Sequence, residues 1–342
     1  EKISQNSKFA FEVASNPEFL REGNAVKDFL YPDRVVIGTE SDSAKSKITE
    51  LYLPFVKSKD QIVNTNIASS ELIKYASNAF LATKISFMNQ MSILSEHFGA
   101  NIDDISKGMG MDPRIGNRFL NAGIGYGGSC FPKDVAALEY QGKEAGVNLS
   151  IVEQTREANK DQKRHFIQKI FNNLTHSELD LAGSGRSIAI LGLAFKPDTD
   201  DVRESPAIEV IKSLLLKNFN IRTYDPKASE VFKKFNPDLK VEYKDSYQEA
   251  IKDAEAAIII TDWAEFKTPE FISNIKNSTI KTIFDGRNMY SLDEAKQLDL
   301  DYISIGRKNV IKNLDSNSLS WPDLNWHEIY FKVMSSNTIL IT

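Results

Sequence analysis

Apolar residues between positions 68 and 98 recur at the spacing of a helix. Leu72, Phe87 and Leu94 belong to this pattern, and neither Pro nor Gly interrupts it before Gly99. The pattern predicts one long helix that stops at Gly99, because glycine is a common helix terminator. This length exceeds that of an average helix, so we expect a spine between domains or subunits.

Shorter patterns flank this segment. They predict a buried strand at residues 9–14 (FAFEVA), a second strand at residues 35–37, and helices at residues 41–53, 133–145 and 152–174. A glycine-rich stretch at residues 123–128 precedes the helix that starts at residue 133.

Strand and helix signals alternate after residue 175. Apolar runs predict strands at residues 187–192 (SIAILG), 221–224, 256–261, 282–285 and 302–305, separated by helical patterns at residues 206–217, 228–235, 248–253 and 292–298. This alternation is typical of a parallel, doubly wound sheet, so the predicted fold class is α/β. Residues 309–342 break the alternation and show no clear period.

Composition limits the classes of protein. The 342 residues suggest two domains at roughly 150 residues each, and 41% hydrophobic content is enough for a core. A net charge of −5 without a basic block argues against a nucleic-acid surface, and no apolar run reaches the ~18 residues of a membrane helix. One cysteine and four scattered histidines predict neither an intrachain disulfide nor a metal site. We expect a cytoplasmic enzyme.

The single cysteine, Cys130, lies in the sequence GYGGSCFPKD. Glycines before it would let the backbone approach a ligand, and Pro132 would open a helix whose N-terminal dipole favours a thiolate. A lone cysteine is more often a packed small apolar residue. Its place between a glycine-rich loop and a helix favours a nucleophile instead.

Two pairs of polar residues are spaced four apart. Lys74 and Asn78 would share one face of the long helix, although for this pair taken alone a solvated lysine and a surface amide are the favoured interpretation. Glu18 and Glu22 could likewise be acids in the first turn of a helix. Together they indicate an acid–base site only weakly.

The alternating half carries candidate ligand contacts after its strands. Lys196 and Arg203 follow the first of these strands and precede a helix, which suits phosphate binding, although the three-glycine dinucleotide fingerprint is absent there. Asp225 could hold a ribose or form a plain turn. Arg287 lies just past the end of another strand, where open α/β sheets place ligand contacts.

Five segments, in order, resemble the UDP-glucose/GDP-mannose dehydrogenase family, and within it the UDP-glucose 6-dehydrogenases. They are NPEFLREGNAVKDFLYPDRVVIG, ELIKYASNAFLATKISFMNQ, RIGNRFLNAGIGYGGSCFPKD, ILGLAFKPDTDDVRESPA and FDGRN, and the resemblance covers about residues 9–308. The cysteine loop is less similar to that of the related UDP-N-acetylhexosamine dehydrogenases.

The resemblance implies that UDP-glucose is oxidised at C6 to UDP-glucuronate with two NAD⁺. It gives Cys130 the role of the nucleophile that forms a thiohemiacetal and then a thioester. Lys74 and Asn78 would stabilise the oxyanion, and Asp134 would manage the alcohol proton with Lys74 and a water. Glu18 would act through water as the base for thioester hydrolysis.

The resemblance also assigns binding roles. The residues implied in substrate binding are Glu18, Phe19, Leu20, Arg21, Glu22, Lys74, Asn78, Arg114, Phe119, Leu120, Asn121, Ala122, Gly123, Gly127, Phe195, Lys196 and Arg287. Those implied in NAD binding are Glu22, Lys133 and Arg203. Arg114 resembles a residue that reaches across a subunit interface, and the resemblance suggests a homodimer or a higher homo-oligomer.

The same resemblance predicts a division of the chain. Its parts are the C-terminal remnant of an NAD-binding domain (1–66), a central helical dimerisation domain with the cysteine loop (67–175), a Rossmann-like UDP-sugar-binding domain (176–308) and a tail (309–342). The family's GxGxxG turn, ribose-binding acid and threonine-bearing loop have no counterpart in this sequence. We therefore expect most of the NAD-binding domain to be missing upstream.

Three alternatives stay open. The chain could oxidise another nucleotide sugar, such as GDP-mannose or UDP-N-acetylmannosamine, or it could be a UDP-sugar-binding fragment without dehydrogenase activity. A cysteine acyl-transfer enzyme is disfavoured because no histidine lies near Cys130 in the sequence.

Overall fold

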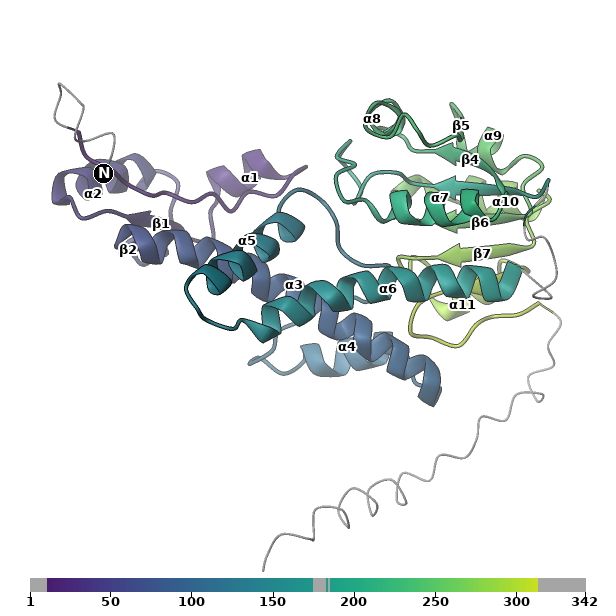
Figure 1. Cartoon of the computed structure of the whole chain (residues 1–342), viewed down its shortest axis with the longest axis horizontal. Coiled ribbons are helices and arrows are strands. Elements are labelled where there is room, and N and C mark those ends of the chain that lie inside the picture. The colour runs from purple at the N-terminus through teal and green to yellow at the C-terminus, as the bar shows by residue number, and fades with distance from the viewer. Residues whose placement is uncertain (1–10, 175–182, 184, 313–342) are drawn as a thin grey trace, which may run out of the picture.

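The computed structural model describes residues 11–174, 183 and 185–312 (Figure 1). Its helices are α1 (Ala25–Leu30), α2 (Asp42–Tyr52), α3 (Ile67–Phe98), α4 (Ile102–Gly110), α5 (Phe131–Glu144), α6 (Ser150–Leu174), α7 (Pro206–Leu216), α8 (Ser229–Phe235), α9 (Tyr247–Ile251), α10 (Pro269–Lys276) and α11 (Leu292–Lys296). Its strands are β1 (Val35–Gly38), β2 (Ile62–Thr65), β3 (Ser187–Leu191), β4 (Asn220–Tyr224), β5 (Glu242–Tyr243), β6 (Ala256–Ile259), β7 (Thr282–Asp285) and β8 (Asp301–Ile303).

The second half of the chain forms a six-stranded sheet in the order β5-β4-β3-β6-β7-β8. All its neighbouring strands are parallel, as in the pairing of Ile188 with both Ile221 and Ala256. The strand order reverses between β3 and β6, which is the switch point at which doubly wound sheets bind ligands. The predicted α/β class is confirmed.

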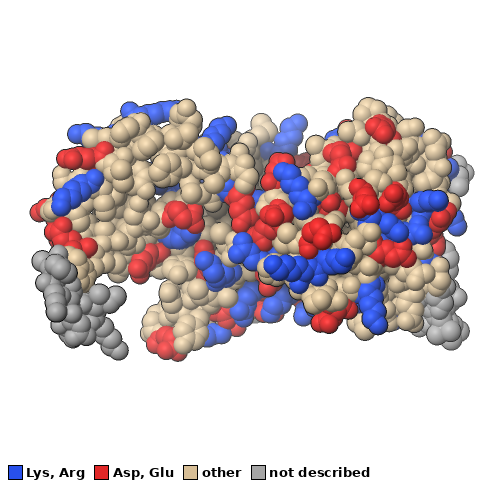
Figure 2. Space-filling view, turned by 90° about the horizontal axis from the view of Figure 1, so that it is seen from above, with Lys and Arg blue, Asp and Glu red and all other residues tan. Residues whose placement is uncertain are grey.

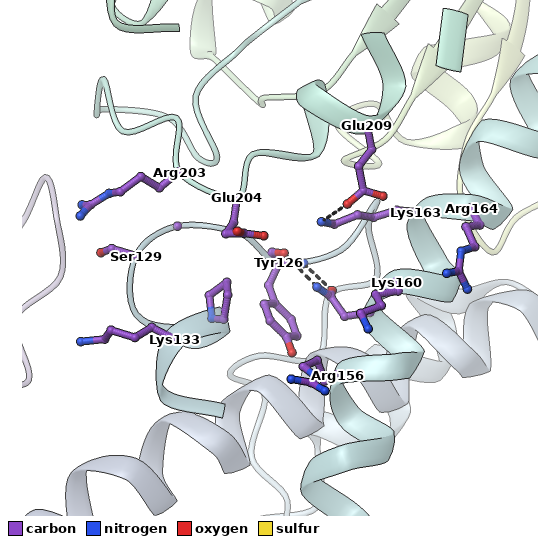
Figure 3. Close-up of a pocket in the computed structure, with 13 residues that line it drawn as sticks. Tyr126, Ser129, Lys133, Arg156, Lys160, Lys163, Arg164, Arg203, Glu204 and Glu209 are labelled. Carbon is purple, nitrogen blue, oxygen red and sulfur yellow. Dashed lines mark hydrogen bonds and ion pairs between the residues drawn. The ribbon is translucent and has the colours of Figure 1, made fainter. Parts of the chain in front are cut away.

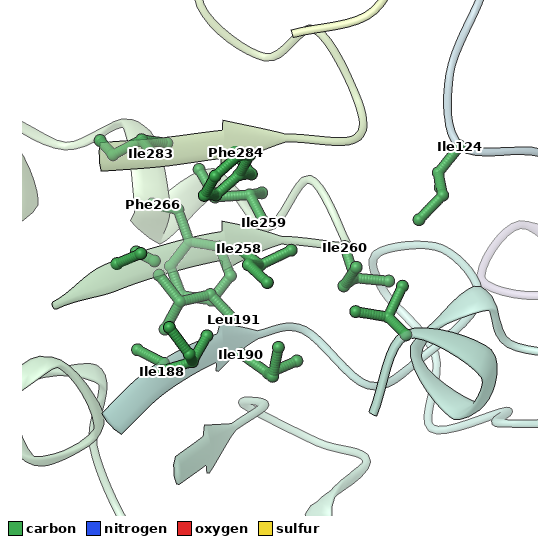
Figure 4. Packing of buried hydrophobic residues seen from close by; sticks show 14 of the residues in the cluster. Ile124, Ile188, Ile190, Leu191, Ile258, Ile259, Ile260, Phe266, Ile283 and Phe284 are labelled. Carbon is green, nitrogen blue, oxygen red and sulfur yellow. The ribbon is translucent and has the colours of Figure 1, made fainter. Parts of the chain in front are cut away.

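The core of this sheet extends into the central helices. Figure 4 shows Ile190, Ile258 and Phe284 of the sheet packed together, with Ile124 of the glycine-rich segment nearby. Ile124 is fully buried in the same cluster, which also contains Met88 of α3. The two regions therefore share one hydrophobic core, and the loop that precedes Cys130 is anchored in it.

Helix α3 has local signals at both ends that explain its bounds. The Asn66 side chain caps the start by accepting a hydrogen bond from Ser69 N–H, and Gly99 ends the helix with a left-handed φ of 68°. The prediction of a helix at residues 68–98 is confirmed to within one residue. Helices α5 and α6 pack against α3, and α6 runs on to the sheet (Figure 1).

The predicted strand at residues 9–14 is wrong in its described part. Residues 11–14 form no strand, and the Phe11 and Val13 side chains are 45% and 56% exposed. The backbone pairs with β1 only through Ser15 and Gly38. An apolar run predicts burial, but a strand also requires a neighbour with which to form a ladder, and composition does not show that neighbour.

Several short elements were not predicted. They include α1, β2, the two-residue β5 and α10, whose sequences are too short or too polar for a period to show. Val310 forms an isolated backbone bridge with Tyr302. Trp321 and Trp326 of the tail lie outside the described residues.

No helix within the described ranges is long and apolar enough to cross a membrane. Basic and acidic side chains are interspersed over the face in Figure 2.

Candidate active site around Cys130

Buried amides hold the loop that leads to Cys130. Asn89 Oδ1 accepts a hydrogen bond from Gly123 N–H at 2.9 Å, and Gln162 Nε2 donates to the Gly123 carbonyl at 2.8 Å. Asn159 binds both the N–H and the carbonyl of Tyr126, at 2.8 and 3.0 Å. The amide side chains of α3 and α6 thus fix the loop backbone. Their position on the buried faces of long helices is the sequence signal that would have indicated this role.

The glycines of this loop are required by contacts with the sheet domain. A Cβ on Gly127 would lie 2.3 Å from the Glu204 carbonyl oxygen. A Cβ on Gly128, whose φ is +82°, would lie 2.7 Å from the Phe195 ring. We expected these glycines to let a ligand approach the backbone. At both positions, however, Glu204 and Phe195 of the sheet domain occupy the space beside the glycine.

Cys130 is the N-cap residue of α5, and its side chain is half-buried. Pro132 lies in the first turn, as the sequence predicted. The Sγ lies 3.6 Å from Ser129 Oγ, and Asp134 N–H donates to the Cys130 carbonyl at 2.8 Å. Because the side chain is half-buried and lies at the start of a helix, its place is that of an accessible thiol rather than of a fully buried structural one.

Asp134 connects the cysteine helix to α3. Its carboxylate accepts a hydrogen bond of 2.6 Å from Asn78 Nδ2, and both residues are buried. Lys133 Nζ lies 3.4 Å from the other carboxylate oxygen. Asn78 is therefore not a surface amide.

Lys74 lies one turn earlier on α3 and holds the segment that contains Glu18. Its Nζ donates to the Glu18 carbonyl and lies 3.1 Å from Glu18 Oε1. Burial raises the pKa of Glu18, but hydrogen bonds from Leu20 N–H and Lys74 outweigh burial, and the net pKa is below the usual range. Glu18 and Glu22 precede α1, so the alternative that they begin a helix is wrong.

Glu22 is where this segment meets the sheet domain. Lys196 Nζ donates to the Glu22 carbonyl at 2.9 Å, and Arg203 lies 3.4 Å from Glu22 Oε1. Burial and the Asp201 carboxylate raise the pKa of Glu22. Glu22 Oε2 is buried and has no hydrogen-bond partner among the described residues.

Arg287 joins the sheet domain to the cysteine loop. It donates to the carbonyls of Ile260 and Phe195 at 2.7 Å each, and more weakly to that of Gly125 at 3.4 Å. Asp285 supports it by accepting a hydrogen bond of 2.8 Å from Arg287 N–H. Its place beyond a strand end is confirmed, and in this structure its donors bind backbone.

Asp225 has a structural role. Its carboxylate accepts hydrogen bonds from the backbone N–H groups of Leu193, Ala194, Lys227 and Ala228 and from the indole of Trp263. The carboxylate is buried among these donors, and this favours the turn over ribose binding.

The remaining residues that were predicted to bind substrate differ in their exposure to solvent. Arg114 follows α4, pairs with Asp112 at 2.6 Å and is 87% exposed. Arg21 pairs with Asp28 at 2.6 Å on the surface, and Leu20 and Asn121 are also exposed. Leu120 and Ala122 are buried. The Phe119 ring packs edge-on against the Phe131 ring. Sequence reasoning missed Arg34, whose guanidinium lies 3.6 Å from the Phe19 ring centre.

A pocket of about 780 Å³ opens on one side of the cysteine loop (Figure 3). Ser129, Lys133 and Arg203 line one end. Four basic residues of α6 that were not predicted from the sequence line the other end: Arg156, Lys160, Lys163 and Arg164.

The fold and the site define an α/β protein with a Rossmann-like sheet and a half-buried cysteine at a helix N-terminus. The first turn of that helix is bonded to an amide of α3, and a lysine one turn earlier on α3 holds a second carboxylate. Residues 1–56, 68–161 and 189–292 match, respectively, the NAD binding domain, the central domain and the UDP binding domain of the UDP-glucose/GDP-mannose dehydrogenase family. The chain belongs to this family.

The chain is 44% identical over 302 residues to a UDP-glucose 6-dehydrogenase of Bacillus subtilis, a match that covers 88% of this chain and 66% of that protein. It is 43% identical over 300 residues to one of Rickettsia bellii, covering 88% and 68%. A UDP-glucose dehydrogenase structure from Pyrobaculum islandicum has a TM-score of 0.75 at 35% identity, covering 87% of this chain and 63% of that one. The chain spans about two thirds of the length of these relatives.

Proposed function

We propose that the protein oxidises UDP-glucose at C6 to UDP-glucuronate, using Cys130 as a covalent nucleophile and two NAD⁺ for each substrate. One observation carries this proposal. Asn78 is bonded to Asp134 at 2.6 Å, one turn from Cys130, and Lys74 of the same α3 holds Glu18 at 3.1 Å. A nucleophile, a cation, an amide donor and two carboxylates therefore belong to one connected group, as two-step alcohol oxidation requires.

The first oxidation produces an aldehyde. Asp134, with Lys74 and a bound water, takes the proton of the C6 hydroxyl as the hydride leaves C6. Asn78 keeps Asp134 oriented for this transfer, because its amide occupies one carboxylate oxygen.

Cys130 then captures the aldehyde. Its thiolate forms a C–S bond, and the carbonyl electron pair moves to the oxygen, which takes a proton to give a thiohemiacetal. Loss of a second hydride from carbon and of the hydroxyl proton gives the thioester. Lys74 and Asn78 stabilise the oxyanions, and one such donor contributes about 10²–10³ in rate.

Water completes the reaction. Glu18 takes a proton from the water that attacks the thioester, the C–S bond breaks, and the Cys130 thiolate leaves. The lowered pKa of Glu18 keeps this carboxylate ionised at neutral pH, which is the state that a base requires.

Glu22, Lys133 and Arg203 fit a dinucleotide. The free and buried Glu22 Oε2 can accept a hydrogen bond from a ribose or amide group, and Lys133 and Arg203 are 73% and 55% exposed. NAD⁺, when bound, supplies the hydride acceptor. These residues orient it through one acceptor and two cations.

We assign substrate binding to the segment from Glu18 to Glu22, the loop from Phe119 to Gly127, and Arg114. From the sheet domain, Phe195, Lys196 and Arg287 contribute to the same substrate-binding site. The division at residues 1–66, 67–175, 176–308 and 309–342 is part of this proposal. Because Cys130 must stay a free thiol to act, the proposal places the enzyme in a reducing compartment such as the cytoplasm.

The proposal includes a homodimer formed through α3. Phe80, Phe87 and Leu94 lie seven residues apart and are 66%, 44% and 44% exposed. A spacing of seven aligns apolar residues along one helix face, as in helices that pack side by side. Arg114, which is exposed near these helices, would then be free to reach a second subunit.

The test is the stoichiometry of the purified enzyme. We expect two NADH for each UDP-glucose consumed. A ratio of one, or turnover with only GDP-mannose or UDP-N-acetylmannosamine, would contradict the proposal. Cys130→Ser should lose turnover and still bind UDP-glucose in calorimetry, and unchanged turnover would exclude the nucleophile role. Binding of UDP-glucose by the wild type without NADH formation would indicate the non-catalytic alternative.

A further inference from the structure

We infer that the α6 end of the pocket in Figure 3 is a binding site for a pyrophosphate group. Of the thirteen described residues that line the pocket, six are Lys or Arg and two are Glu. The whole chain has a net charge of −5, so this excess of cations is local. Concave sites with converging charged donors are where proteins bind small anions.

Four of the cations come from one face of α6. Arg156, Lys160, Lys163 and Arg164 are spaced i, i+4, i+7 and i+8, which places them along one side of a helix. In Figure 3, Lys160, Lys163 and Arg164 project from α6 on one side of the pocket, and Arg156 lies next to the hydroxyl of Tyr126. A single rigid helix therefore sets the separation of these donors.

The four cations have acidic partners of two kinds: Arg156 and Lys163 pair with Glu139 and Glu209, whereas the partners of the other two are exposed and leave donors available. Lys160 and Arg164 pair with Glu157 and Asp161 on α6 itself, and these pairs are exposed to solvent. Exposed pairs of this kind are weak, so an anion can replace them at little cost.

The inner wall has buried donors that lack partners. Tyr126 is 7% exposed, and its hydroxyl is buried without a hydrogen-bond partner among the described residues. Arg156 Nε likewise has no partner among the described residues, although the terminal nitrogen of the same guanidinium pairs with Glu139 at 3.1 Å. The Lys163 side chain is 6% exposed and pairs with Glu209 at 2.7 Å. Buried donors without acceptors are unfavourable, and a bound anion would bring acceptor oxygens to this wall.

The chemistry of the donors favours phosphate over carboxylate. Two guanidinium groups and two ammonium groups offer more N–H donors than one carboxylate has acceptor sites, whereas a pyrophosphate offers several charged oxygens at two centres. The opposite end of the pocket, at Lys133 and Arg203, belongs to the proposed dinucleotide site. None of the four α6 cations is among the residues assigned to that site.

The experiment titrates inorganic pyrophosphate into the 342-residue chain by calorimetry, without substrate or cofactor. We expect saturable binding that weakens as KCl is raised, because screening reduces the attraction. The variant Lys160→Gln/Arg164→Gln should bind about tenfold more weakly, as expected for the loss of two solvent-exposed charge contacts. The control, Lys276→Gln/Lys281→Gln, removes the same charge at exposed positions far along the chain and should bind within twofold of the wild type.

Absence of saturable binding, or equal loss in the control, would overturn the inference. Competition then identifies the source of the pyrophosphate. Displacement by NAD⁺ would assign the site to the cofactor and displacement by UDP-glucose to the substrate, whereas persistence with both present would indicate a separate ligand. Because no turnover is measured, the outcome is independent of the dehydrogenase proposal.

Discussion

Asn78 and Asp134 are 56 residues apart in the sequence, and their side chains are joined by a hydrogen bond of 2.6 Å. The bond ties the middle of α3 to the first turn of α5, whose N-cap is Cys130. This buried amide–carboxylate contact adds a specific polar link to the packing of Ala79 and Ala82 of α3 with Val135 and Leu138 of α5, and together they set the position of Cys130 relative to α3.

Asn78→Ala should lower kcat about 100-fold with little change in KM. The substitution removes an oxyanion donor and leaves Asp134 without its amide partner. Steady-state kinetics with UDP-glucose checks this expectation. The control is Ser86→Ala, which removes another buried hydrogen bond of α3, from Ser86 Oγ to Thr155, and should keep kcat within twofold. Equal losses in the two variants would mean that general damage to α3 is responsible.

Gly127→Ala should destabilise the protein by about 1–3 kcal/mol. Its Cβ would lie 2.3 Å from the Glu204 carbonyl oxygen, so the loop or the sheet domain must move. Gly108→Ala in α4 is the matched control, because a Cβ there meets nothing within 4 Å, and it should be neutral or stabilising by up to about 1 kcal/mol. Denaturant unfolding measures both. A neutral Gly127→Ala would show that the loop does not pack on Glu204.

Glu96→Gln should destabilise the protein by about 2–3 kcal/mol at neutral pH. Glu96 Oε1 accepts from Lys169 Nζ at 2.6 Å and from Gly306 N–H at 2.7 Å, and His165 Nε2 lies 3.0 Å from Oε2. Loss of the charge leaves Lys169, itself buried, without its carboxylate. Thermal unfolding checks this, with Glu157→Gln of an exposed pair as a control that should change stability by less than about 0.5 kcal/mol.

The effect of Glu96→Gln should also depend on pH. Burial raises the pKa of Glu96, but His165, Lys169 and the Gly306 N–H outweigh burial, and the net pKa lies below the usual range of a glutamate. A carboxyl group with a lowered folded-state pKa stabilises the fold above its unfolded pKa, and this contribution is lost as pH falls through the folded value. The difference between wild type and variant should therefore shrink as pH falls below about 4.5. A difference that grows below that pH would contradict this pairing.

Phe80→Glu/Phe87→Glu should convert the proposed dimer to a monomer. The two rings lie on the exposed apolar side of α3, and two carboxylates there would be desolvated in a helix–helix interface. Light scattering after size exclusion measures the mass. Phe235→Glu on α8 is the control, because this ring is 63% exposed but lies in the sheet domain, and it should leave the mass unchanged. A wild-type monomer would remove the dimer from the proposal.

Local patterns in the sequence predicted most of the elements. The alternation after residue 175 predicted the parallel sheet, and Gly99 predicted the end of α3. Pro132 predicted that a helix would begin beside Cys130. These predictions succeeded because each depends on neighbours within a few residues. The strand predicted at residues 9–14 failed because a strand depends on a partner elsewhere in the chain.

The sequence alone also indicated which residues could carry chemistry, from Cys130 and its loop and from the resemblance to a family. Only the tertiary structure showed how they connect: Lys74 to Glu18 across 56 residues, and Lys196 to the Glu22 carbonyl across 174. It also showed that Gly127 and Gly128 face the sheet domain and that the basic face of α6 lines a pocket. Helix and turn signals act over a few residues, whereas these contacts form only after distant segments pack around a shared core, so no local pattern encodes them.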